Sequence, residues 1–171
     1  MSPAIIFDSH LVLGYAAWLL CTRVWVWPRL KAMATDDAQR AIAMLHSFRF
    51  FGLVFILPGV VGPALPEDFA TFAAWGDLVT GVLAMAALSV PPRPALFRPL
   101  VVAFNVAGMV DLVVDYYHGT TLDLAGLSGQ LGAAYVIPIV YVPILMITHV
   151  IAFRLLLRPI KSANTSIPAA A

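Results

Sequence analysis

Hydrophobic residues fill five long stretches of the chain, which short segments containing proline, glycine and charged residues separate. A helix needs about 20 apolar residues to cross the hydrocarbon core of a bilayer, and backbone groups in lipid must be bonded within their own segment. The alternation expected of a membrane barrel is absent. The pattern therefore predicts an all-α, polytopic membrane helical bundle. The five transmembrane helices are predicted at residues 10–27, 41–61, 69–90, 99–117 and 131–157.

These helices are expected to form a single domain over residues 1–161, followed by a flexible tail over 162–171. Prolines mark several boundaries, because proline lacks the N–H group that continues a helix. Pro28 is expected to end the first helix, and Pro99 to lie in the first turn of the fourth, where the missing donor costs little. Pro138 and Pro143 are expected to bend the fifth helix.

The composition supports a membrane protein. Hydrophobic residues make up 61% of the chain and charged residues 11%, whereas soluble chains average roughly 45–50% and about 25%. This balance excludes a water-soluble monomer and a disordered chain. The net charge of +1 provides no field for nucleic acid, and the single cysteine, Cys21, excludes an internal disulfide. The expected partner is the lipid bilayer, and a homo-oligomer or a larger membrane complex stays open.

Charge asymmetry predicts the orientation. Nine of the ten basic residues lie on or beside one face, and cytoplasmic loops are the ones enriched in Lys and Arg. These nine are Arg23, Arg29, Lys31, Arg40, Arg93, Arg98, Arg154, Arg158 and Lys161. The opposite face carries acidic residues, namely Asp8, Glu67, Asp68, Asp115 and Asp123. We expect the N-terminus outside and the C-terminus in the cytoplasm. The short loops and compact size favour a bacterial inner membrane.

Several polar side chains lie within the predicted spans, where they usually face a bundle interior. The candidate polar core comprises His46, Arg49, Asp77, Asn105, Asp111, Tyr141 and His149. At about 1.5 Å per residue, Arg49, Asp77, Asn105 and Asp111 fall in the middle-to-outer layer, and the two histidines fall in an inner layer. Arg49 is expected to pair with Asp77, because either charge alone is costly in lipid. Asp111 is either a second partner or a rim residue.

Three functions fit this core, and no soluble catalytic motif is present. The first is binding of a lipid, isoprenoid or other small amphiphile within the bundle, with Arg49 and Asp77 at its head group. The second is an intramembrane enzyme that uses Asp77 as a general acid or base. The third is a redox subunit with haem b between His46 and His149. A proton relay and a purely structural ion pair are further alternatives, and no other cofactor or metal is expected.

Two segments, Gly76-Asp77-Leu78 and Tyr135 to Leu145 with its prolines, resemble the EXPERA group of sterol isomerases and sigma-2-type receptors. Those are small helical membrane proteins with buried acidic residues and a proline-containing last helix. The resemblance covers about a quarter of the chain. It implies an isomerase-like activity in which Asp77 is the one catalytic residue that carries over.

Overall fold

The computed structural model describes residues 1–91 and 94–158, and all regular secondary structure in these residues is helical. The predicted tail over 162–171 lies outside the described residues, as do Arg93 and Lys161. The elements are α1 (Pro3–Cys21), the π-helix η1 (Thr22–Val26), α2 (Trp27–Ala32), α3 (Thr35–His46), the 3₁₀-helix η2 (Ser47–Ile56), α4 (Glu67–Ser89), α5 (Pro94–Thr121), the 3₁₀-helix η3 (Ser128–Tyr135), the π-helix η4 (Ile137–Tyr141) and α6 (Val142–Leu156).

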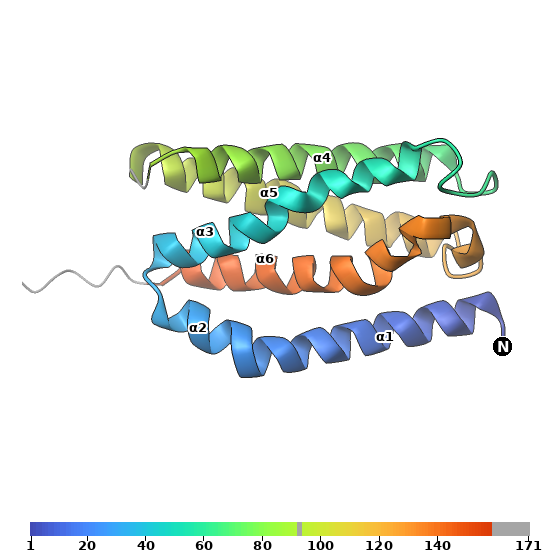
Figure 1. Ribbon diagram of the computed structural model, residues 1–171, viewed down its shortest axis with the longest axis horizontal. Coiled ribbons are helices and arrows are strands. Elements are labelled where there is room, and N and C mark those ends of the chain that lie inside the picture. Colours follow the sequence, from blue (N-terminus) through green and yellow to red (C-terminus); the bar gives the residue numbers. More distant parts are fainter. Residues whose placement is uncertain (92–93, 159–171) are drawn as a thin grey trace, which may run out of the picture.

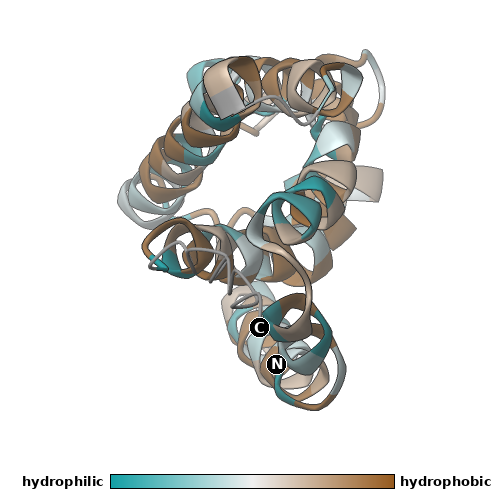
Figure 2. Cartoon of the chain, turned by 90° about the vertical axis from the view of Figure 1, so that its left-hand side faces the viewer, coloured by the Kyte–Doolittle hydropathy of each residue, from teal (hydrophilic) through white to brown (hydrophobic). Residues whose placement is uncertain are grey.

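The chain runs back and forth along one long axis, so that successive helical rods are antiparallel (Figure 1). We call the end that holds Met1, the loop 57–66 and the segment 122–127 the N-terminal end. The opposite end holds the start of α3 and the last turn of α6. Seen along the rods, α1 lies to one side of the other helices (Figure 2), and it packs mainly against α6, η3 and η4. The face of α1 that points away from the other helices is therefore exposed, and its side chains are apolar.

Within residues 1–91 and 94–158, four helices are long enough and apolar enough to cross a membrane: Pro3–Ala32, Glu67–Ser89, Ala95–Thr121 and Ile137–Leu156. This number and the apolar surface indicate an integral membrane protein. The predicted second span is not among the four. Its first half, α3, is polar at its start, with Asp36 and Asp37 in the first turn, and its second half is not α-helical.

The first helix is longer than predicted. It starts at Pro3, where the Ser2 side chain accepts a hydrogen bond from the Ile5 backbone, and it continues to Ala32. The prediction that Pro28 ends this helix is wrong. The π-helical turn η1 comes just before Pro28, and its wider bonding pattern lets the chain continue past a residue without an N–H group.

The prediction of one α-helix over 41–61 is also wrong. The α-helical part is α3, which starts earlier, and the chain then tightens into ten residues of 3₁₀-helix. The helical path ends at Ile56, because Pro58 has no N–H group and Gly59 has a φ of +81°. Residues 57–61 therefore belong to the loop.

The remaining boundaries differ in detail. Helix α4 matches its prediction closely, whereas α5 starts at Pro94, which places Pro99 inside the helix and not in its first turn. The predicted last span divides into η3, η4 and α6, and Gly132, with a φ of +52°, interrupts η3. The π-helical turn η4 comes just before Pro143. As with η1 and Pro28, its wider hydrogen-bonding pattern lets the helix continue past a residue that has no N–H group.

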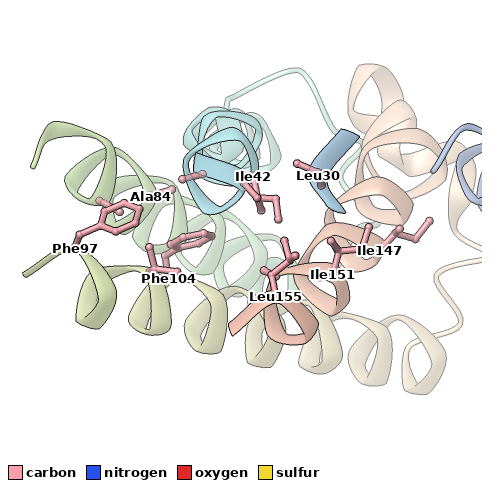
Figure 3. Close-up of a cluster of buried hydrophobic side chains, with 13 residues drawn as sticks. Leu30, Ile42, Ala84, Phe97, Phe104, Ile147, Ile151 and Leu155 are labelled. Carbon is pink, nitrogen blue, oxygen red and sulfur yellow. The ribbon is translucent and has the colours of Figure 1, made fainter. Parts of the chain in front are cut away.

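Two clusters of buried apolar side chains hold the rods together. One lies towards the opposite end and joins α2, α3, α4, α5 and α6, with Phe97, Phe104 and Leu155 fully buried in it (Figure 3). The other lies towards the N-terminal end and includes Phe55, Phe69 and Leu131. The predicted polar residues lie between these two clusters, at a level where Gly52, Gly76 and Gly108 allow close helix contacts.

Candidate functional site

Arg49 is the centre of the polar core and has no exposed surface. Its Nε donates to Asp77 Oδ1 at 2.6 Å, and its Nη2 donates to Asp111 Oδ2. Its Nη1 donates to the Gly108 carbonyl at 3.3 Å and lies 3.4 Å from His149 Nε2. One guanidinium thus joins η2 to α4, α5 and α6. The expected pairing with Asp77 is present, and Asp111 is a second partner and not a rim residue.

Glycines make room for these charges. A Cβ atom at Gly52 would lie 2.7 Å from Asp77 Cγ, and one at Gly76 would overlap the Asp111 carboxylate. A Cβ atom at Gly108 would lie 2.7 Å from the guanidinium Nη1. Such distances are far below a normal van der Waals contact. The three glycines therefore let the helix backbones approach until the charged groups meet, which is the common use of small residues in membrane helices.

The 3₁₀-helix η2 keeps the buried positions in one line. With three residues per turn, residues at i and i+3 lie directly above one another. Arg49, Gly52 and Phe55 are buried at this spacing, and His46 precedes them at the same spacing. In an α-helix the same positions would rotate around the axis. The period of three was the signal in the sequence for this geometry, and a reading based on α-helical spacing missed Gly52.

Asn105 lies with the histidines and not beside Arg49, although the depth estimate placed it with the charges. Its Nδ2 donates to the Val101 carbonyl at 2.8 Å, which leaves Oδ1 free to accept from His149 Nδ1 at 2.9 Å. His149 therefore carries its proton on Nδ1 and presents the lone pair of Nε2 to Arg49. This chain of hydrogen bonds fixes one tautomer of His149 and joins the two expected layers into one network.

His46 makes the other histidine contact. The Thr148 hydroxyl donates to the Ile144 carbonyl at 2.7 Å, so its oxygen accepts from His46 Nε2 at 3.0 Å. The rings of His46 and His149 lie against each other, with centroids 4.0 Å apart. They do not fit the axial ligation of one haem, because this spacing leaves no room for a porphyrin between them and both Nε2 atoms face protein groups.

Tyr141, the last predicted core residue, is separate from the charged group. Its hydroxyl donates to the Leu45 carbonyl at 3.0 Å. Leu45 lies at the end of α3, where the α-helix changes to the 3₁₀-helix. The contact therefore supports the junction between α3 and η2, which carries Arg49.

A cavity of about 260 Å³ lies between the ion-paired residues Arg49, Asp77 and Asp111 and the N-terminal end. Its walls come from α1, η2, α4, α5, the segment 123–131, η4 and the start of α6. The lining residues are Phe7, Asp8, Leu11, Phe55, Phe69, Ala73, Asp77, Asp115, Tyr116, Gly119, Thr120, Asp123, Leu124, Ala125, Leu131, Ile137, Pro138 and Val142. Asp8, Thr120 and Asp123 are exposed, so the cavity reaches the surface at this end. Asp77 lines this cavity and is also paired with Arg49, so it connects the cavity to the buried ion pairs.

Asp115 is a residue that the sequence analysis did not include in the core. It lies one helical turn beyond Asp111 on α5 and lines the cavity. Its Oδ1 is buried and has no hydrogen-bond partner among the described residues, and the same holds for Asp111 Oδ1. The i, i+4 spacing to Asp111 was the available signal, but its place beside an outer loop made it resemble a solvated residue.

Comparison with known proteins gives a family and no function. No curated protein and no solved structure matches the chain. Residues 6–157 match the family model described as "Domain of unknown function (DUF8737)". The matched range holds the whole polar network and all the residues that line the cavity. The chain therefore belongs to the DUF8737 family.

Proposed function

We propose that this is a five-crossing membrane protein in which α3 and η2 together form the fifth crossing. Twelve α-helical and ten 3₁₀-helical residues extend about 38 Å at about 1.5 and about 2.0 Å per residue, which exceeds a hydrocarbon core of about 30 Å. Arg49 on this path is neutralised by acids from its neighbours, which removes the main obstacle to burying it in lipid.

In this arrangement the N-terminal end faces outward, because the described basic residues other than Arg49 lie towards the opposite end. A bacterial inner membrane is the proposed location, given the short connecting segments. Single cysteines in a Cys21→Ala background test the orientation. A cysteine at Thr120 is expected to react with an impermeant maleimide in intact cells, and one at Ser89 only after lysis. The reverse labelling would contradict the proposal.

The function we propose is binding of a small amphiphile in the 260 Å³ cavity. The observation that carries it is a largely apolar cavity that opens at one end and has four carboxylates among its lining residues. Binding sites for small molecules are concave and apolar and have a few directing polar groups. An engineered cavity of 150 Å³ holds benzene, so this cavity has room for about ten non-hydrogen atoms. That is a head group with a short chain, or the head of a longer amphiphile.

A photoreactive diazirine analogue of 1-octanol tests this binding in phosphatidylcholine nanodiscs. Irradiation and peptide mapping are expected to place the label on cavity residues such as Phe69 and Leu124, with protection by unlabelled 1-octanol. Gly119→Leu fills the cavity from α5, where a Cβ atom meets only ordinary van der Waals contacts with Leu124. It is expected to abolish this labelling.

Gly129→Leu is the matched control, because Gly129 is exposed and nothing lies within 4 Å of its Cβ position. It should label as the wild type does. Labelling of lipid-facing residues alone, or equal labelling of the Gly119→Leu and wild-type proteins, would contradict the proposed function.

A further inference from the structure

Four of the six polar side chains that line the cavity are carboxylates, and the other two are the hydroxyls of Thr120 and Tyr116, the latter bonded to the Tyr15 hydroxyl at 2.6 Å. The carboxylates are those of Asp8, Asp77, Asp115 and Asp123, and none of the described lining residues is Lys, Arg or His. The Thr120 hydroxyl already donates its hydrogen to the Tyr117 carbonyl at 2.8 Å. A molecule that satisfies these groups must therefore bring donors of its own.

Arg49 does not neutralise all of this charge. Its guanidinium bonds Asp77 and Asp111, so one positive charge already faces two carboxylates. Asp115 then adds a third carboxylate on the same side of α5, and no described basic side chain contacts it. A carboxylate oxygen without a partner in an apolar site is costly, and a positively charged donor relieves that cost better than a neutral one.

The mouth of the cavity carries the same sign. Asp8 and Asp123 are exposed there, one on α1 and one in the turn after α5. Asp123 Oδ1 accepts from the Gly126 backbone, which fixes the orientation of this carboxylate at the entrance. Clefts lined by one sign of charge raise the local concentration of the opposite ion. Cations are therefore favoured at the entrance as well as inside.

We infer that the amphiphile bound here carries a protonated amine, which donates to the carboxylates of Asp115 and Asp77 that line the cavity, while its short hydrocarbon part packs against the apolar wall. This inference rests on the proposed function and names its ligand class. The cavity volume favours a free alkyl- or arylammonium of about ten non-hydrogen atoms over an intact phospholipid.

The test is competition against the diazirine probe by three molecules of similar size: n-octylammonium, 1-octanol and octanoate. Octylammonium is expected to compete at about tenfold lower concentration than octanol, since a hydrogen bond to a charged group contributes about 1.5–3 kcal/mol and about 1.4 kcal/mol is tenfold. Octanoate should be the weakest. Partition into the nanodisc is the same for every protein variant, so ratios between variants do not depend on it.

Asp115→Asn keeps the shape of the side chain and removes its charge. It is expected to weaken octylammonium competition about tenfold and to leave octanol within about twofold. Asp115→Glu should keep the preference for the ammonium. Glu67→Gln is the matched control, because Glu67 is an exposed acid near the same end that does not line the cavity. Circular dichroism confirms that each variant is folded.

The outcomes separate the two proposals. If octanol protects the cavity but octylammonium is no better, or if Asp115→Asn changes neither, the ammonium inference is overturned and amphiphile binding stands. If none of the three molecules protects the cavity residues, the proposed function itself is wrong. If phosphatidylethanolamine in the nanodisc competes as well as octylammonium, the site belongs to a lipid head group, and a free amine is excluded as the ligand.

Discussion

Replacing Arg49 by methionine removes the one Lys or Arg that the described residues contribute to the buried network, while roughly keeping the side-chain length. The side chain has no exposed surface, and two of its bonds are to carboxylates that are 6% and 5% exposed, Asp77 and Asp111. Each charge-assisted hydrogen bond contributes about 1.5–3 kcal/mol, and removal of one partner of a buried pair costs about 3–5 kcal/mol. Arg49→Met is therefore expected to lower the free energy of unfolding by at least about 3 kcal/mol.

The cause of that loss can be tested by neutralising the acids. In the triple variant Arg49→Met, Asp77→Asn and Asp111→Asn, no ion pair is left incomplete, and the free energy of unfolding should recover by about 2 kcal/mol or more over the single variant. Reversible unfolding in mixed micelles, followed by circular dichroism, measures both. A triple variant as unstable as Arg49→Met would refute the reasoning, because shape and not charge would then decide the loss.

Arg98→Met is the matched control for these measurements. Arg98 lies at the surface, with its side chain 43% exposed and its Nε 3.6 Å from Asp36. Exposed ion pairs contribute about 0–1 kcal/mol. The control is therefore expected to unfold within about 1 kcal/mol of the wild type. A loss as large as that of Arg49→Met would mean that the assay does not distinguish buried from exposed charges.

Three further predictions follow from the site. Gly108→Ala is expected to lower the free energy of unfolding by about 1–3 kcal/mol, because its Cβ would press on Arg49 and His149. Gly129→Ala is the control and should leave the free energy of unfolding unchanged, since nothing lies within 4 Å of its Cβ position. Thermal unfolding compares the two variants. Asn105→Leu removes the acceptor of His149 Nδ1, so nitrogen NMR should show the loss of the single Nδ1–H tautomer, and an unchanged spectrum would contradict that contact. Protein from cells supplied with a haem precursor should be colourless, and a haem absorption band would contradict the assignment of both histidines to protein contacts.

The residue types, and the depth of each polar residue within its predicted span, were sufficient to predict the all-helical fold and the pairing of Arg49 with Asp77. The reason is energetic: a charge in an apolar segment needs a partner, and few partners exist at a given depth. The same argument could not place Asn105, because an amide has no charge that demands one particular partner. Its contact with His149 depends on the relative rotation of α5 and α6, which spacing within one helix does not determine.

The helix boundaries and the cavity depended on features that average periodicity does not capture. The two π-helical turns show that a proline can lie within a rod when the turn before it widens, so Pro28 did not end its helix. The 3₁₀-helix η2 places Arg49 and Gly52 one above the other facing α4, and α-helical periodicity does not predict this alignment. Asp115 could not be distinguished from a solvated acid without knowing that it lines a cavity together with α1 and the segment 123–131.

A high-resolution cryo-electron microscopy map of the protein in a lipid nanodisc, bound to a rigid antibody fragment, tests the central claim most directly. We predict continuous side-chain density that places the Arg49 guanidinium between the carboxylates of Asp77 and Asp111, with an open cavity on the Asp115 side. Density that directs the Arg49 side chain into lipid, or separates it from both acids by more than a hydrogen-bond distance, would contradict the account.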